Sequence, residues 1–245
     1  MKAYLFFLTE DFMKELSYDE YHSYFFSTDA YISVRPYFGE VVSIALADDF
    51  DLKYCEKGRW WYSEWNNHCR KVINLFAAKG TMYPIVWGYN YDFIPRLNNQ
   101  DKFVYHRTEK SFATDIEDTF YSHVHYDPNL MSRMETLQIR AKYCLPSDTN
   151  NLEIAREYVY DVVKRNIPFM EWFSRVQTIE DVVEELDRQI AQSIAFEYRY
   201  SLYTKAFLLA KLHRMDEAIE TMQLRYGGKT PEKVLKKLYQ VNEME

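Results

Sequence analysis

Apolar side chains in the C-terminal part of the chain recur every three or four residues, which is the spacing of one face of an α-helix. One such stripe consists of Ile179, Val182, Val183, Leu186, Ile190 and Ile194. Thr178 stands directly before this stripe, and Asp181 lies three residues further on, which is the arrangement of an N-terminal capping box. Residues 149–245 are therefore predicted to form an α-helical region.

Helix-breaking residues separate the predicted helices of this region. Pro168 ends or kinks the first helix, and Gly227-Gly228 interrupt the chain before the last. Pro231 suits the first position of the final helix. The expected order is a helix from Leu152, one from Ile179, two over Tyr203–His213 and Asp216–Tyr226, and a last one from Pro231.

Residues 1–148 combine extended and helical patterns. Segments rich in β-branched and aromatic residues predict strands over Ala30–Phe38, Val41–Ala47, Tyr83–Ile94 and Phe103–Arg107, the first two forming a hairpin across Gly39-Glu40. Helices are predicted over Thr9–Tyr24, His68–Lys79 and Leu130–Cys144, and from Ser111 onward. We therefore expect an α+β fold, with an antiparallel sheet packed by helices in residues 1–148, followed by the helical region 149–245 in one compact unit.

Glycine is scarce, and this excludes one large class of functions. The chain has six glycines, where an average composition would give roughly 17. It contains neither G-x-x-x-x-G-K-[ST] nor G-x-G-x-x-G, the two loops whose exposed backbone holds phosphates. Nucleotide binding by either loop is excluded, and no cofactor is expected.

Charge and cysteine content point to a cytoplasmic protein. The net charge is −7, so the chain as a whole repels nucleic acid and anionic membranes, and it suits a basic partner or simply solubility. Its three cysteines include no C-x-x-C pair, which fits free thiols in a reducing compartment. No stretch approaches the roughly 18 apolar residues of a membrane span. We expect no nucleic-acid or membrane partner.

The aromatic content allows two interpretations. The chain has 22 tyrosines, 16 phenylalanines and 5 tryptophans. Large rings bury much area in a core, which is their commoner use. Tyrosine and tryptophan are also enriched at protein interfaces, so the same composition would suit a surface that binds a partner.

Two resemblances concern the helical region. The segment from Tyr203 to Met222 resembles one helix pair of a tetratricopeptide-type repeat, but no second copy follows at a period of about 34 residues. More broadly, residues 154–226 are similar to the tail of an uncharacterised bacterial domain-of-unknown-function family. The similarity lies in the order of a helix, Ile167-Pro168-Phe169, Thr178-Ile-Glu-Asp and an Asp-Glu-Ala-Ile hairpin. It implies an α+β half before the tail and supplies no activity or site residue.

One polar cluster is a candidate anion-binding site. It consists of Arg96, His106, Arg107, Lys110 and Ser111. If a strand ends near Arg107 and a helix begins near Ser111, helix N–H groups and cations converge as an anion requires. The alternative is a solvated loop in which Ser111 caps the helix and the charges pair with one another.

A second cluster is a candidate metal site. His123 and His125 share one face of an extended segment, and Asp127 follows two residues later. With His106, these side chains offer three nitrogens and a carboxylate to Zn²⁺, with Glu109 or Asp118 as the nearest general base. The alternative is an ordinary pair of histidines before a turn.

These patterns leave two function classes open, and no catalytic residue is assigned. Cys69 beside His68 does not form a nucleophilic pair, because the two side chains of adjacent residues rarely meet. The first hypothesis is a non-enzymatic cytoplasmic binding protein of bacterial type, immunity- or inhibitor-like, with an unknown protein partner. The alternative is a hydrolase of a phosphate-containing substrate built on the histidine, arginine and lysine cluster, with or without a metal.

Overall fold

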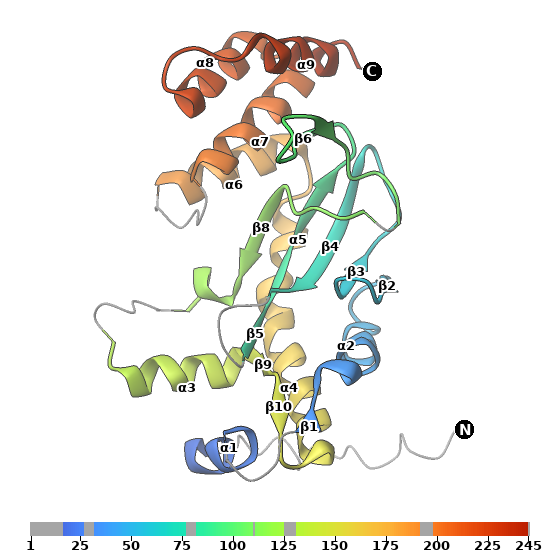
Figure 1. The fold of residues 1–245 in the computed structure, drawn as a ribbon, viewed down its shortest axis with the longest axis vertical. Coiled ribbons are helices and arrows are strands. Elements are labelled where there is room, and N and C mark those ends of the chain that lie inside the picture. The colour runs from blue at the N-terminus through green and yellow to red at the C-terminus, as the bar shows by residue number, and fades with distance from the viewer. Residues whose placement is uncertain are drawn as a thin grey trace.

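The computed structural model describes residues 17–26, 32–76, 82–109, 111–124, 131–191 and 198–244. Most of the predicted helix over Thr9–Tyr24 lies outside these residues. The first described helix is α1 (Tyr18–Phe25), which begins with a capping box between Ser17 and Glu20. The fold is α+β, with a mostly antiparallel sheet and C-terminal helices (Figure 1), as the sequence predicts.

The main sheet is antiparallel and is built around one long strand. Its strands are β2 (Lys53–Cys55), β3 (Trp60–Tyr62), β4 (Cys69–Leu75), β5 (Met82–Tyr91) and β8 (Ile116–Thr119), adjacent in that order, and β9 (Cys144–Pro146) pairs with the first residues of β5. Every residue of β5 is buried. The strand predicted over Tyr83–Ile94 is therefore confirmed as far as Tyr91.

Two short ribbons lie outside the main sheet. They are β1 (Ile32–Ser33) with β10 (Asp148–Thr149), and β6 (Arg96–Leu97) with β7 (Phe103–Val104). The strand predicted over Phe103–Arg107 thus reaches only Val104 and pairs with β6. Single turns of 3₁₀-helix occur over Arg35–Tyr37 and Phe120–Ser122.

The predicted hairpin of Ala30–Phe38 and Val41–Ala47 is wrong. Only β1 is extended there, and the chain continues as helix α2 (Phe38–Leu46). The buried residues of α2 are Phe38, Val41, Val42, Ala45 and Leu46. This three- and four-residue spacing forms one helix face, and burying that face against the core outweighs the strand preference of the β-branched residues.

The predicted helix over His68–Lys79 is also wrong, because its described part is strand β4. The reason is the turn before it. Asn67 and His68 have φ of +46° and +65°, and Asn66 and Cys69 exchange both backbone hydrogen bonds around them. A two-residue turn with both central residues at positive φ joins twisted antiparallel strands, so Cys69 must continue as a strand.

No helix begins at Ser111. Residues 111–114 are loop and lead into β8. The later helices agree better with the sequence: they are α3 (Arg133–Tyr143), α4 (Leu152–Met170), α5 (Trp172–Arg175), α6 (Ile179–Ala191), α7 (Tyr198–Lys211), α8 (Met215–Tyr226) and α9 (Glu232–Asn242). Thr178 and Asp181 form the predicted capping box, with Asp181 N–H donating to Thr178 Oγ1 at 3.1 Å.

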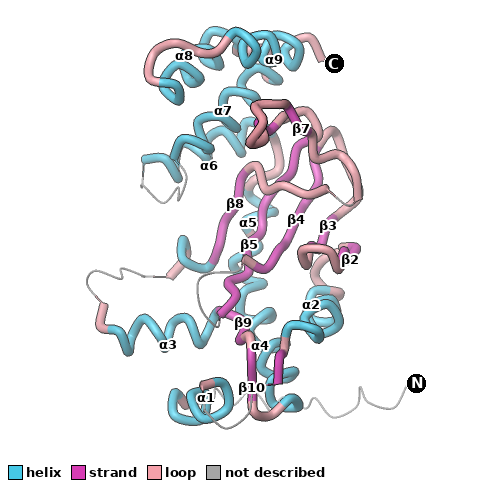
Figure 2. Tube along the Cα trace, viewed as in Figure 1, coloured by secondary structure: helices cyan, strands magenta, loops and turns pink. Residues whose placement is uncertain are grey.

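The molecule is elongated, and its C-terminal helices gather at one end (Figures 1 and 2). The long helix α4 runs beside the sheet and packs on α2, while α7 packs on α8 and α9. One apolar core contains residues from both the sheet region and the helices. Among the described residues, none of the helices combines the length and apolar character needed to span a membrane.

The tyrosines belong to the core and its margin. Among those whose side chains the structure describes, only Tyr239 is exposed, at 51%. Tyr89 and Tyr203 are buried and donate to the carbonyls of Val176 and Pro95, at 2.6 and 2.8 Å. The aromatic content is therefore mainly a core feature, and a tyrosine-rich surface does not form in the described part of the chain.

Candidate functional site

A buried arginine organises the polar region between the sheet and the loop over residues 105–115. Arg70 lies on β4 opposite Asn90 on β5, and only 2% of it is exposed. Its Nε and Nη2 both donate to Asn90 Oδ1, at 3.0 and 2.8 Å, and Nη2 also donates to the Ser111 carbonyl at 2.9 Å. The guanidinium thus ties two strands to the loop.

Aromatic rings enclose this guanidinium. Its central carbon lies 4.4 Å from the ring centre of Trp65 and 4.5 Å from that of Phe112, with Tyr62 at 5.5 Å. A cation over ring faces is stabilised by their quadrupoles, more so where water is excluded. Burial also lowers the pKa of Arg70 from its usual value. The rings and hydrogen bonds offset part of the desolvation cost of the charge.

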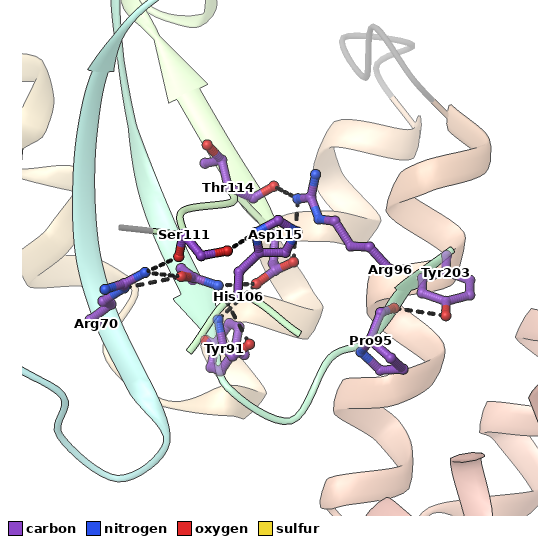
Figure 3. A network of polar contacts seen from close by, with 10 residues as sticks. Arg70, Tyr91, Pro95, Arg96, His106, Ser111, Thr114, Asp115 and Tyr203 are labelled. Atoms are coloured by element: carbon purple, nitrogen blue, oxygen red, sulfur yellow. Dashed lines mark hydrogen bonds and ion pairs between the residues drawn. The ribbon is translucent and has the colours of Figure 1, made fainter. Parts of the chain in front are cut away.

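The hydrogen-bond network of Arg70 continues through Asn90 to the buried carboxylate of Asp115 (Figure 3). Asp115 Oδ2 accepts from Asn90 Nδ2 at 3.0 Å and from the backbone N–H of Tyr91 at 2.7 Å. Its Oδ1 lies 3.4 Å from Nη2 of Arg96, which also donates to the Thr114 carbonyl. Asn90 therefore links the cation of Arg70 to the anion of Asp115, and Arg96 completes the line. We call Arg70, Asn90, Asp115 and Arg96 the clasp.

His106 lies beside the clasp. Its Nδ1 is 2.9 Å from Ser111 Oγ, and Figure 3 marks this contact with a dashed line. Burial lowers the pKa of His106, and the neighbouring charge of Arg96 lowers it further. A neutral imidazole suits this position because an imidazolium would be a third positive charge beside the guanidinium groups of Arg96 and Arg70.

The structure brings together only part of the predicted anion-binding cluster. Arg96, His106 and Ser111 are neighbours, but Arg107 points elsewhere: its Nε donates to the Asp92 carbonyl and its guanidinium lies 4.0 Å from the Tyr105 ring centre. Lys110 lies outside the described residues. The guanidinium of Arg96 is directed at a carbonyl and a carboxylate of the protein itself, which is the use expected of a structural contact.

The structure describes only one of the three residues of the predicted metal cluster. His123 is described, whereas His125 and Asp127 lie outside the described residues. His123 Nε2 lies 2.7 Å from the carboxylate of Asp118, whose side chain is fully buried. Within the described ranges, no three histidine, cysteine or acidic side chains lie close enough together to hold a metal ion.

The cysteine beside a histidine is not a reactive pair. His68 Nδ1 contacts the carboxylate of Asp92 at 3.0 Å, away from Cys69. Burial raises the pKa of the Cys69 thiol to about 12. A thiol with so high a pKa forms little thiolate and is a poor nucleophile near neutral pH.

One charged surface was not singled out from the sequence. The outward side of α6 exposes Glu180, Glu184 and Asp187, which are four and three residues apart, while Val182 and Leu186 face the core. A cavity with a volume of 270 Å³ lies at the start of this helix, and its lining is Arg175, Val176, Asp181, Glu184, Glu185 and Arg188. We call the exposed carboxylates and this cavity the α6 face.

The cavity wall contains a fixed ion pair. Glu185 is buried and receives hydrogen bonds from Arg188 Nε at 2.8 Å and from Gln189 Nε2 at 3.0 Å. Although burial acts in the opposite direction, the bonds and charge of Arg188 lower the pKa of Glu185. Gln189 also donates to the Glu117 carbonyl at 3.1 Å, which fastens α6 to the edge strand β8.

No family model, curated protein or solved structure matches this chain. The resemblance of residues 154–226 to an uncharacterised bacterial family therefore stays a prediction. Arg70 and Asn90, which hold the clasp together, were missed because they are distant in sequence from the loop that they bind. An arginine close in sequence to several aromatic residues was the one available signal.

Proposed function

We propose that this chain is a non-enzymatic binding protein and that its α6 face receives a basic protein partner. The observation that carries this proposal is the pair of exposed carboxylates on α6, Glu180 and Glu184, beside a cavity. Asp187 in the same row is exposed and forms an ion pair with Lys205 of α7. A basic surface would approach such a row faster than a neutral one, since opposite charges steer diffusional encounter.

The packing beneath α6 makes the α6 face rigid. Val182, Val183 and Leu186 are buried beneath it, and the Glu185–Arg188 pair fixes the cavity wall. A rigid helix presents its side chains with less loss of entropy on binding than a loop does. The acidic net charge of the chain adds to the attraction at longer range.

The contacts of the clasp argue against the alternative function, a hydrolase of a phosphate-containing substrate. A phosphate site needs donors that are directed at the ligand. Here Arg70 donates to Asn90 and Ser111, and Arg96 donates to Thr114. These contacts support a structural role, in which the arginines hold the loop to the sheet, more than a substrate site. The binding protein is therefore the favoured proposal.

The proposal is tested by reversing the charge of the α6 face. The variant carries Glu180→Lys, Glu184→Lys and Asp187→Lys. Its matched control carries Asp48→Lys, Asp51→Lys and Glu56→Lys, three exposed acids outside α6, and so has the same net charge. Both are checked by circular dichroism and used as bait in native lysate beside the wild type.

We expect a partner that the wild type and the control capture and the α6 variant does not. The capture should weaken as salt is raised, since screening reduces attraction between exposed charges. Equal capture by all three proteins, or no reproducible partner, would overturn the proposal.

A further inference from the structure

His123 is held in place by a buried carboxylate. Its Nε2 lies 2.7 Å from Asp118 Oδ2, and the side chain of Asp118 has no exposed surface. The other oxygen, Asp118 Oδ1, accepts the backbone N–H of Thr119 at 2.8 Å. Both oxygens of the carboxylate are thus engaged, and its direction toward the imidazole is fixed.

Two aromatic rings hold the plane of the imidazole. Phe169 of α4 stacks on it with ring centres 5.1 Å apart and planes at 14°, and Trp87 of β5 lies at 6.0 Å and 28°. Asp118 is the register partner of Trp87 across β5 and β8. Residues from a helix and from two strands therefore orient this one side chain.

The arrangement selects the tautomer of the neutral imidazole. A carboxylate only accepts hydrogen bonds, so Nε2 must carry the hydrogen and the lone pair lies on Nδ1. The side chain is 20% exposed, and its ring contacts with the described residues are the Asp118 pair and the two stacked rings. Nδ1 carries the lone pair, and within the described residues it has no hydrogen-bond partner.

We propose that His123 is a nucleophile toward neutral acyl donors, with Nδ1 as the attacking atom and Asp118 as its positioning residue. This activity is separate from binding at the α6 face. The partly exposed ring of Phe169 beside the imidazole suits an uncharged ester. The Asp118 carboxylate suits a reaction that makes the imidazole cationic and opposes an anionic donor such as a phosphate ester.

The reaction is balanced without a cofactor. The Nδ1 lone pair attacks the carbonyl carbon of the ester, a C–N bond forms, and the C–O bond breaks as the alkoxide leaves with its electron pair. The acyl-imidazolium keeps its Nε2–H on Asp118, which stabilises its positive charge. Water then adds to the carbonyl carbon and the C–N bond breaks, which restores the neutral imidazole. The proton that the water loses goes to the alkoxide through solvent, so one water has been consumed to give acid and alcohol.

The experiment uses 4-nitrophenyl acetate as the probe. Release of 4-nitrophenolate is followed for the wild type, for His123→Gln and for Asp118→Asn. Glutamine offers an amide N–H to Asp118 and lacks the basic nitrogen, so His123→Gln keeps the carboxylate partnered. His22→Gln removes an exposed histidine elsewhere and is the matched control.

We expect His123→Gln to lower the rate about tenfold or more and His22→Gln to leave it unchanged. Acid-quenched wild-type protein should carry the acetyl group on His123, as peptide mass spectrometry will show. Asp118→Asn should slow the reaction, and the imidazole ¹⁵N signals of His123 should change from one tautomer to a mixture. An unchanged rate in His123→Gln, or acetylation mainly at His22, would overturn the proposal and leave His123 as a structural partner of Asp118.

Discussion

Replacing Arg70 by methionine should destabilise the protein strongly, because the clasp depends on this side chain. Methionine has a similar length and no donors. The substitution leaves Asn90 Oδ1 and the Ser111 carbonyl without their Arg70 donors, and it removes the cation between Trp65 and Phe112. Asp115, close by, loses a compensating charge as well.

The magnitude follows from these losses. A buried acceptor without a donor costs about 1–3 kcal/mol, and the cation–ring contacts add about 1 kcal/mol. We expect the free energy of unfolding to fall by about 3–5 kcal/mol, which is the range for removing one partner from a buried polar network. Arg70→Lys should lie between the wild type and Arg70→Met, since an ammonium keeps the charge without the planar fork.

Urea unfolding followed by tryptophan fluorescence measures the effect. Arg175→Met is the matched control, because Arg175 is exposed and the clasp does not include it. That variant should change the free energy of unfolding by less than about 0.5 kcal/mol. A loss below about 1 kcal/mol in Arg70→Met would refute the view that the clasp fastens the loop to the sheet.

Three further predictions concern His106, Gly88 and the anion hypothesis. The surroundings of His106 lower its pKa, so its contribution to stability should be complete above the unfolded pKa of about 6.5 and be lost as the pH falls through the folded pKa. The urea midpoint should therefore fall less steeply between pH 7 and 5 in His106→Gln than in the wild type. An equal slope would contradict this. Gly88→Ala should lower the free energy of unfolding by on the order of 3 kcal/mol or more, because its Cβ would lie 1.9 Å from the Ile116 carbonyl oxygen. A thermal midpoint like that of the wild type would show instead that β8 moves aside easily. Inorganic phosphate should leave the thermal midpoint unchanged, since Arg96 is directed at Thr114 and Asp115. Stabilisation by roughly 2–3 kcal/mol at a hundredfold excess over the dissociation constant would instead support the predicted anion-binding site.

Local signals explain why the C-terminal helices were predicted well. The stripe of α6, the capping box at Thr178 and the glycines after α8 all lie within a few residues of the structure that they determine. Gly227 has φ of +70° and accepts the left-handed conformation at the end of α8, which glycine adopts without strain. Such elements need little information from the rest of the chain.

The elements that were mistaken share a different property, since two local patterns competed in each. Val41 and Val42 favour a strand by type and a helix by spacing, and burial of the face of α2 decided for the helix. In β4, Cys69, Val72 and Ile73 have helical spacing, but the turn at Asn67 and His68 forces an antiparallel return. The asparagine was a usable turn signal, and the apolar spacing outweighed it in the prediction.

Whether a group of cations binds a ligand or the protein itself depends on contacts that are distant in sequence. Three members of the candidate anion-binding cluster, Arg96, His106 and Ser111, lie near one another without the helix on which the prediction depended. The group that receives the charge of Arg96 is Asp115, placed by pairing of its segment with β5. A buried carboxylate costs free energy unless donors surround it, so Asp115 requires Asn90, the Tyr91 N–H and Arg96 together. The polarity of this region is therefore explained first by the need to bury one acid, and any ligand there must compete with that carboxylate for the same guanidinium.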